Sequence, residues 1–304
     1  MKKLLPLFIV FLTVFSASAK EAPLANDYVF QKQLIVAYGQ KKHTCQAVRI
    51  HKNWFLTAAH CVEMCKETVC QTRVVLADGK VSAVASFTAS DIFVPEGYRE
   101  VTDKGVKTHT FWDVALLHYQ KGVTYEYADG GVASPESFQQ ALAEDADLKT
   151  QWDGALKPKI PLLYVFQEKR VRGMHFNLIV PLWENGEMSF LSKPEQVLYL
   201  GQKQSLWASA GFGVDSGNSG GGVYLSKRGL LGVATAKRVN DLPADVRKDY
   251  PAFADNSEFF LFNGFSKKTT FAFIESTLLR FGDRVKTKEL KEVLEPVVIG
   301  EGLN

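Results

Sequence analysis

Cysteine is scarce in this chain of 304 residues, and all four cysteines lie between positions 45 and 70. No Cys-x-x-Cys pair is present, so the spacing does not match the usual structural zinc sites. An excess of one charge is also missing, because 36 Lys and Arg face 33 Asp and Glu. This balance gives no support for a nucleic-acid partner. The sequence shows no internal repeat and no low-complexity tract.

Only the first residues form a long apolar run, and they resemble an export signal. Lys2 and Lys3 precede an apolar segment from residue 4 to 15, and Ala17-Ser18-Ala19 offers small residues for cleavage. The segment is short for a membrane span, although an uncleaved anchor is the alternative. We expect residues 1–19 to be removed, which leaves 285 residues with a net charge of +1. The mature protein is expected to be secreted or periplasmic, without a membrane segment.

An exported chain meets an oxidising compartment, so four cysteines indicate two disulfides. Cys45, Cys61, Cys65 and Cys70 allow three pairings, and the spacing alone does not choose among them. A zinc site is the competing interpretation, because His43, His51 and His60 lie nearby in the sequence.

Short β-rich runs separated by Gly, Asn, Lys and Asp make up most of the chain, which favours a sandwich or barrels over βαβ units. Two sets of strands are predicted. The first covers residues 33–38, 45–50, 54–57, 72–76, 81–88 and 114–119. The second covers residues 161–166, 176–181, 196–200, 222–225, 230–235 and 258–262.

Two helices interrupt this pattern. Ser134-Pro135 is typical of a helix start, and the segment from Glu136 to Trp152 is rich in Ala, Gln and acids, so a linker helix is predicted there. From Thr269 to Phe281, apolar residues recur at helical spacing, which indicates core packing more than a binding surface. The resulting domains are 1–19, 27–121, 122–160 as the linker, 161–283, and a tail at 284–304 that is expected to fray.

Three segments carry the chemistry. In Leu56-Thr57-Ala58-Ala59-His60-Cys61, a histidine follows a strand and small residues, and its pKa range suits a general base. Taken alone, His60 could equally be a structural or surface residue.

The second segment is Phe111-Trp112-Asp113-Val114-Ala115-Leu116-Leu117. A carboxylate that enters an apolar strand is costly unless it is hydrogen-bonded. Asp113 could fix a histidine tautomer, and the alternative is an ordinary turn aspartate.

The third segment is Asp215-Ser216-Gly217-Asn218-Ser219-Gly220-Gly221-Gly222. Its glycines allow a tight turn in which an exposed hydroxyl lies beside backbone N–H donors, as acyl transfer requires. The alternative is a plain glycine-rich turn.

Together the three motifs resemble those of the trypsin/chymotrypsin-like serine peptidases, of the bacterial type with a Gly-Asn-Ser-Gly-Gly loop. The histidine, aspartate and serine also follow the family order, and the resemblance covers roughly residues 33 to 281. It implies an all-β fold of two six-stranded antiparallel β-barrels with the active site in the cleft between them. A linker helix and a C-terminal helix complete this expected architecture.

The resemblance also implies roles for individual residues. Ser219 is expected to be the nucleophile, His60 the general base and Asp113 its orienting acid, while Gly217 and Ser219 supply the oxyanion-hole N–H groups. Cys45–Cys61 resembles the family's histidine-loop disulfide, which leaves Cys65–Cys70. The strand containing Thr235, Ala236 and Lys237 resembles the one that pairs with extended substrate.

Two departures from the animal digestive members concern activation. Those proteins carry an aspartate before the nucleophile that pairs with a new N-terminus of sequence Ile-Val-Gly-Gly. Here the residue is Asn218, and the nearest N-terminal sequence is Leu34-Ile35-Val36-Ala37-Tyr38. We therefore expect that cleavage at this point is not needed for activity.

Specificity is indicated only weakly. Gly213 occupies the expected floor of the primary pocket with Val214 beside it, so a preference for Lys or Arg is not expected. Lys237 could favour an acidic residue, or it could simply face solvent.

The leading hypothesis is a monomeric serine endopeptidase that acts on proteins or peptides, with no cofactor, no metal and no nucleic-acid partner. A catalytically silent binding module on the same fold is the alternative. A lipase of the α/β-hydrolase type is disfavoured, because its residue order and parallel-sheet pattern are missing.

Overall fold

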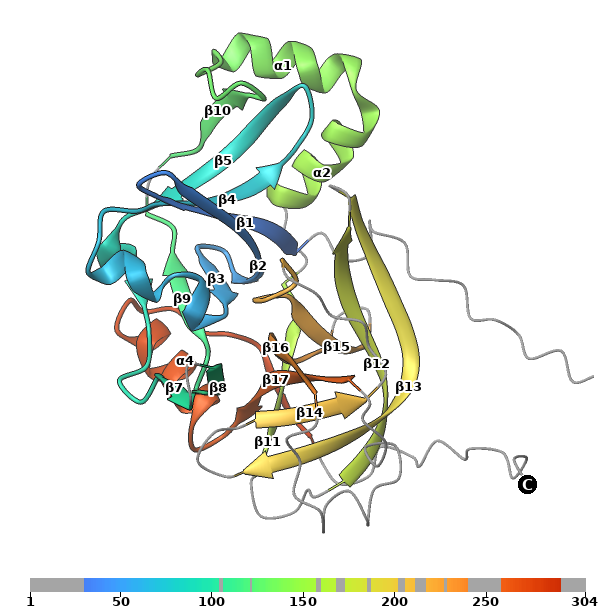
Figure 1. The fold of residues 1–304 in the computed structure, drawn as a ribbon. Helices are drawn as coiled ribbons and strands as arrows, with labels where there is room; N and C mark the ends of the chain where they lie inside the picture. Colours follow the sequence, from blue (N-terminus) through green and yellow to red (C-terminus); the bar gives the residue numbers. More distant parts are fainter. Residues whose placement is uncertain are drawn as a thin grey trace, which may run out of the picture.

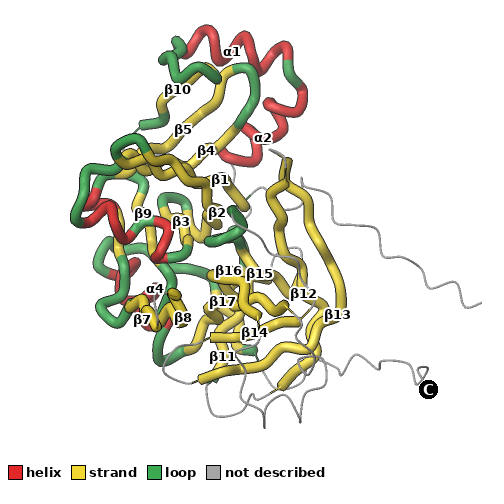
Figure 2. Tube along the Cα trace, in the orientation of Figure 1, coloured by secondary structure: helices red, strands yellow, loops and turns green. Residues whose placement is uncertain are grey.

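Two curled β-sheets form most of the molecule in the computed structural model (Figures 1 and 2). The structure describes residues 30–103, 106–120, 122–156, 160–167, 173–184, 187–201, 206–210, 217–226, 229–239 and 258–290. The predicted signal segment 1–19 lies outside this range. Each sheet has eight strands, and this double-barrel arrangement confirms the predicted fold class.

The first sheet has the strand order β10-β5-β4-β1-β2-β3-β9-β6, with antiparallel pairing throughout. Its core is apolar and includes Leu34, Phe55 and Val74. The strands are β1 (Gln31–Tyr38), β2 (Lys41–His51), β3 (Trp54–Thr57), β4 (Gln71–Ala77), β5 (Val81–Phe87), β6 (Ile92–Phe93), β9 (Ala115–His118) and β10 (Thr124–Tyr127). A separate hairpin joins β7 (Arg99–Asp103) to β8 (Val106–Phe111).

The second sheet closes on itself. Pairing of β14 with β17 completes a ring of six antiparallel strands in the order β14-β13-β12-β15-β16-β17, which matches the predicted six-stranded barrel. Two further strands, β11 and β18, add to its outside by parallel pairing. The strands are β11 (Leu162–Phe166), β12 (Gly173–Glu184), β13 (Glu187–Gly201), β14 (Leu206–Ala210), β15 (Gly222–Ser226), β16 (Gly229–Val239), β17 (Glu258–Ser266) and β18 (Thr287–Glu289).

The predicted single linker helix is wrong in one respect, because the segment forms two helices, α1 (Pro135–Glu144) and α2 (Ala146–Leu156). Ser134 caps α1 as expected, accepting from the N–H of Ser137 at 3.2 Å. Asp145 ends α1 with extended backbone, and its Oδ1 accepts from the N–H of Leu148 at 2.9 Å, which starts α2.

These helices cover the upper end of the first sheet in Figure 1. Phe138 and Leu148 are buried in the core of that sheet. The two helices therefore belong to the first barrel in their packing, and they do not act as a free spacer between the barrels.

The C-terminal helix is confirmed as α4 (Thr270–Leu279), with Phe271, Ile274 and Leu278 buried as predicted. The prediction is wrong for Phe281, which lies beyond the end of the helix and is 43% exposed. The helix packs in a core shared by both barrels, where it meets Trp54 and Leu56 of the first. The same core includes Leu116 of β9.

The expectation of fraying from residue 284 onward is wrong at its beginning. Strand β18 pairs with β11, and Leu290 is buried. The N–H of Leu290 donates to the carbonyl of Val165 at 2.7 Å, so backbone pairing holds this part of the tail.

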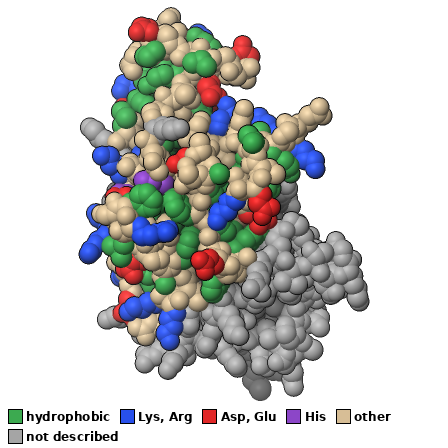
Figure 3. Space-filling model, turned by 90° about the vertical axis from the view of Figure 1, so that its left-hand side faces the viewer, with side chains coloured by type: hydrophobic (Ala, Val, Ile, Leu, Met, Phe, Trp, Pro, Cys, Tyr) green, Lys and Arg blue, Asp and Glu red, His purple; other side chains and the backbone are tan. Residues whose placement is uncertain are grey.

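Among the described residues, no helix has both the length and the apolarity that a membrane crossing requires. On the face drawn in Figure 3, basic and acidic side chains are interspersed over the described part. This distribution agrees with the small net charge.

Candidate active site

The first site residue, His60, follows directly from strand β3. The chain leaves β3 at Thr57, passes the buried Ala58, and enters a short 3-10 turn at Ala59–Cys61. Cys61 forms a disulfide with Cys45 of β2, which ties this turn to the sheet. A second disulfide joins Cys65 to Cys70, so both expected pairings are present and no described cysteine is free.

Asp113 lies just before β9 on a tightly bent segment. Trp112 has a positive φ of 50°, which is uncommon for a large residue, and the N–H of Val114 donates to its carbonyl at 2.7 Å. The bend turns Asp113 into the protein, where it is fully buried.

His60 provides two hydrogen bonds to Asp113. The His60 backbone N–H donates to Oδ1 at 2.9 Å, and the imidazole Nδ1 lies 2.6 Å from Oδ2. With a carboxylate as acceptor, Nδ1 carries the proton and Nε2 is left as the basic nitrogen. The His60 side chain remains 26% exposed, and its Nε2 lies 3.7 Å from Cys61 Sγ.

The segment Gly217–Gly222 carries the predicted nucleophile Ser219 and is called the nucleophile loop below. It is held by backbone hydrogen bonds to both barrels. From the first barrel, the N–H of Gln46 donates to the carbonyl of Ser219 at 2.7 Å. From the second, the N–H of Gly220 donates to the carbonyl of Ala234 at 2.8 Å. Gly217 and Gly220 have positive φ values of 97° and 81°, which glycine adopts without strain.

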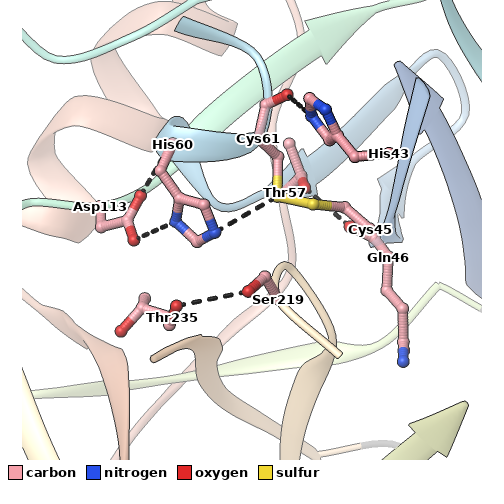
Figure 4. The surroundings of a disulfide bond; sticks show 9 residues. All are labelled: His43, Cys45, Gln46, Thr57, His60, Cys61, Asp113, Ser219 and Thr235. Atoms are coloured by element: carbon pink, nitrogen blue, oxygen red, sulfur yellow. Dashed lines mark hydrogen bonds and ion pairs between the residues drawn. A yellow bond between two sulfur atoms is a disulfide. The ribbon is translucent and has the colours of Figure 1, made fainter. Parts of the chain in front are cut away.

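Close packing explains why position 220 must be glycine. A Cβ atom there would lie 2.1 Å from the carbonyl oxygen of Gln46 and 3.2 Å from the nitrogen of Ala58. The loop therefore packs directly on the segment that leads to His60. In Figure 4, Ser219 lies across from the His60 ring, and its hydroxyl is hydrogen-bonded to Thr235.

The hydroxyl of Ser219 donates to the carbonyl of Thr235 on β16 at 3.4 Å, a long and weak hydrogen bond. Among the bonds found within the described residues, neither the N–H of Gly217 nor that of Ser219 serves as a donor. Both groups are therefore available within this part of the chain.

A known protein family matches this chain over most of its length. The family model for trypsin matches residues 23–254. The chain belongs to the trypsin family. A comparison with curated protein sequences gives no match.

Solved structures of trypsin-like proteins resemble this trypsin-family chain in fold at low identity. An inactivated protease paralogue of the scabies mite has a TM-score of 0.50 and 15% identity, covering 86% of this chain and 100% of that one. A Glu endopeptidase has a TM-score of 0.46 and 14% identity, covering 82% and 90%. The protease Anisep of Arthrobacter nicotinovorans has a TM-score of 0.45 and 11% identity, covering 80% and 93%.

The substrate-binding residues expected from the sequence are only partly described. Thr235 is buried on β16, and its Oγ1 donates to the carbonyl of Leu261 at 3.2 Å. Ala236 and Lys237 continue β16 and pair in register with Leu261 and Phe260 of β17. Gly213 and Val214 lie outside the described residues.

One cavity of about 870 Å³ lies between the segment at residues 92–96 and helix α4. His60, Asp113 and Ser219 do not line it, although Trp112 does. This cavity is therefore separate from the candidate active site.

Sequence reasoning missed the residues that support the nucleophile loop from the first barrel. Gln31 and Gln46 are both buried, on β1 and β2, and form a side-chain hydrogen bond at 2.7 Å. The residue type alone does not distinguish these two glutamines from the others in the chain, because their role depends on the pairing of β1 with β2. The one available signal is that Gln46 directly follows Cys45.

Proposed function

We propose that this trypsin-family chain is an active, exported serine endopeptidase with Ser219 as nucleophile, His60 as general base and Asp113 as orienting acid. The observation that carries the proposal is the doubly hydrogen-bonded pair of Asp113 and His60. A fully buried carboxylate is costly, and here the cost is offset by two donors from one histidine. That arrangement sets the tautomer that a general base needs.

In the proposed reaction, Ser219 Oγ attacks the carbonyl carbon of the scissile peptide while His60 Nε2 accepts the hydroxyl proton. The tetrahedral oxyanion is stabilised by the N–H groups of Gly217 and Ser219. Collapse breaks the C–N bond, and His60 transfers its proton to the departing amine. Water then attacks the acyl-enzyme with His60 again accepting a proton, and release of the acid restores Ser219.

The weak hydrogen bond from Ser219 to Thr235 is compatible with this role, because the hydroxyl can turn away from Thr235 at little cost in hydrogen-bond energy. This bond does not distinguish the proposal from the alternative, a catalytically silent module on this fold in which the hydroxyl is never activated. The two functions differ in the reactivity of Ser219.

Intact-mass analysis after exposure to a fluorophosphonate probe distinguishes them, with Ser219→Ala as the matched control. We expect one stoichiometric adduct on the wild type and none on the variant. Cleavage of an unstructured protein substrate at internal bonds should accompany the adduct and should disappear in Ser219→Ala. If folded wild-type protein, also after limited proteolysis, forms no adduct and cleaves nothing, the silent-module function replaces this proposal.

Export is part of the same proposal, and the sequence of residues 1–19 supports it. The two disulfides suit an oxidising compartment. N-terminal sequencing of the protein recovered outside the cytoplasm should begin just after Ala19. A mature protein that retains Met1 and remains attached to membranes would contradict it.

A further inference from the structure

A buried chain of amide side chains connects the first barrel to the residue before the nucleophile. Gln31 Nε2 donates to Gln46 Oε1 at 2.7 Å, and Gln46 Nε2 donates to Asn218 Oδ1 at 2.9 Å. All three side chains are at least 96% buried. The residues come from β1, β2 and the nucleophile loop, so the network crosses the interface between the barrels.

The direction of each amide follows from one backbone group. Gln31 Oε1 accepts from the N–H of Gly222 at 3.0 Å and from the hydroxyl of Tyr224 at 2.8 Å. A backbone N–H can only donate, so this atom of Gln31 must be the oxygen. Gln31 therefore offers its NH₂ to Gln46, which in turn offers its own NH₂ to Asn218. The side chain at position 218 is thus required to be an acceptor.

Gln46 also contacts the loop through its backbone. Its N–H donates to the carbonyl of Ser219, and its carbonyl accepts from Thr57 Oγ1 at 2.7 Å. A Cβ atom on Gly221 would lie 2.9 Å from Gln46 Oε1, so the side chain packs against the loop. In Figure 4 the Gln46 side chain extends away from His60, and it contacts none of the reacting groups.

We infer that Gln46 is a positioning residue for the nucleophile loop, and that its hydrogen bond to Asn218 takes the place of an ion pair to a cleaved N-terminus. The bond fixes the side chain between Gly217 and Ser219, whose N–H groups are the proposed oxyanion donors. A neutral acceptor at position 218 needs no buried ammonium group, and Gln46 supplies the donor from within the chain. This inference rests on the proposed function.

The test uses Gln46→Met in the mature protein, because methionine keeps the length of the side chain but has neither the donor to Asn218 nor the acceptor for Gln31. Losing these two buried hydrogen bonds should lower both kcat on a peptide substrate and the rate of fluorophosphonate labelling by roughly 10-fold. KM should change by less than about twofold, because the oxyanion donors act in the transition state.

Tyr224→Phe is the matched control in the same network. It removes one hydrogen bond to Gln31 but leaves the N–H of Gly222 to orient that amide. We expect its kcat to stay within about twofold of wild type, even though its stability also falls through the loss of a buried hydrogen bond. Equal losses of kcat in the two variants would reduce Gln46 to an ordinary structural residue and overturn the inference.

Asn218→Leu and Asn218→Asp test the other end of the bond. Leucine should reproduce most of the Gln46→Met loss of kcat. Adding Gln46→Met in that background should lower kcat by less than about twofold more, because the hydrogen bond between Gln46 and Asn218 is already absent. Aspartate keeps the acceptor and should retain activity without any N-terminal trimming. Additive losses in the double variant, or an Asn218→Asp enzyme that works only after trimming, would overturn the inference.

Probe labelling of the wild type distinguishes failure of the proposed function from failure of the positioning role of Gln46. If wild-type Ser219 does not react with the probe, the proposed function fails. If wild type reacts and Gln46→Met reacts equally fast, only the positioning role fails.

Discussion

Asp113 and His60 are joined twice, since one carboxylate oxygen accepts from the backbone N–H at 2.9 Å and the other lies 2.6 Å from the imidazole Nδ1. The first bond places the carboxylate independently of the ring. The second bond then orients the His60 ring, because the Asp113 carboxylate is already held by the backbone N–H.

Asp113→Asn should abolish most activity while preserving the fold. The amide has a single acceptor oxygen for two donors, so the imidazole is driven to the tautomer with the proton on Nε2. We expect kcat to fall by about 10⁴-fold, measured on a peptide substrate. Asp91→Asn is the control, because Asp91 is also buried and accepts from the N–H of Thr88, but lies in a different turn. A loss in Asp91→Asn as large as in Asp113→Asn would contradict the assignment.

Gly97→Ala should disturb the bend that carries Asp113. A Cβ atom at position 97 would lie 2.0 Å from the indole of Trp112, which must then move. Overpacking of this kind costs about 1–3 kcal/mol, and kcat should fall as well, because Trp112 adjoins Asp113. Chemical denaturation and peptide hydrolysis measure the two effects.

Gly122→Ala is the matched control for this substitution, since a Cβ atom there meets nothing within 4 Å. Its stability should stay within about 0.5 kcal/mol of wild type. A Gly97→Ala protein as stable and active as Gly122→Ala would show that Trp112 is not constrained.

Stability should rise with pH above neutrality because of Lys32. This side chain is buried on β1, and burial, with the nearby charge of Arg49, lowers its pKa from 10.5 to about 7. The unfolded chain therefore binds more protons than the folded chain between these values, so the free energy of unfolding increases with pH across this window. From pH 7.5 to 9 the gain attributable to Lys32 is at most about 2 kcal/mol.

Guanidinium titrations of wild type and Lys32→Met at the two pH values isolate this effect. The wild type should gain stability relative to the variant as the pH rises, because methionine has no proton to lose. If the difference between the two proteins is the same at both pH values, Lys32 is charged in the folded state.

Cleavage after Lys or Arg should be weak. The sequence places no acid at the expected pocket floor, where Gly213 and Val214 stand. Profiling on a peptide library measures the preference, with Lys237→Ala testing whether an acidic residue is favoured. Strong cleavage after Arg would refute this expectation. An unchanged profile in Lys237→Ala would show that Lys237 faces solvent and does not select an acidic residue.

Local patterns in the sequence predicted the elements that local physics determines. The strand runs, the Ser134 cap and the apolar stripe of α4 were identified because each depends on neighbouring residues. The break at Asp145 was missed, because an aspartate inside an Ala-rich run can cap a new helix as readily as it can continue the old one.

Features that depend on distant pairing could not be predicted in this way. Strand β18 forms because it can pair with an edge of β11. The sequence of residues 287–289 alone does not predict this pairing. The motifs around His60 and Ser219 could be found, but the support of Asn218 by Gln46 joins residues that are far apart in the chain.

The shared core between the barrels has a consequence for the order of folding. Trp54 and Leu56 of the first barrel are buried against Ile274 and Leu278 of α4, from opposite ends of the chain. A polypeptide that emerges from an export channel with its N-terminus first cannot cover these apolar residues until its last helix arrives. Contacts this distant in sequence also make folding slow and cooperative. For the exported protease proposed above, assembly of the site therefore waits until nearly the whole chain has been delivered, and its activity begins only after translocation.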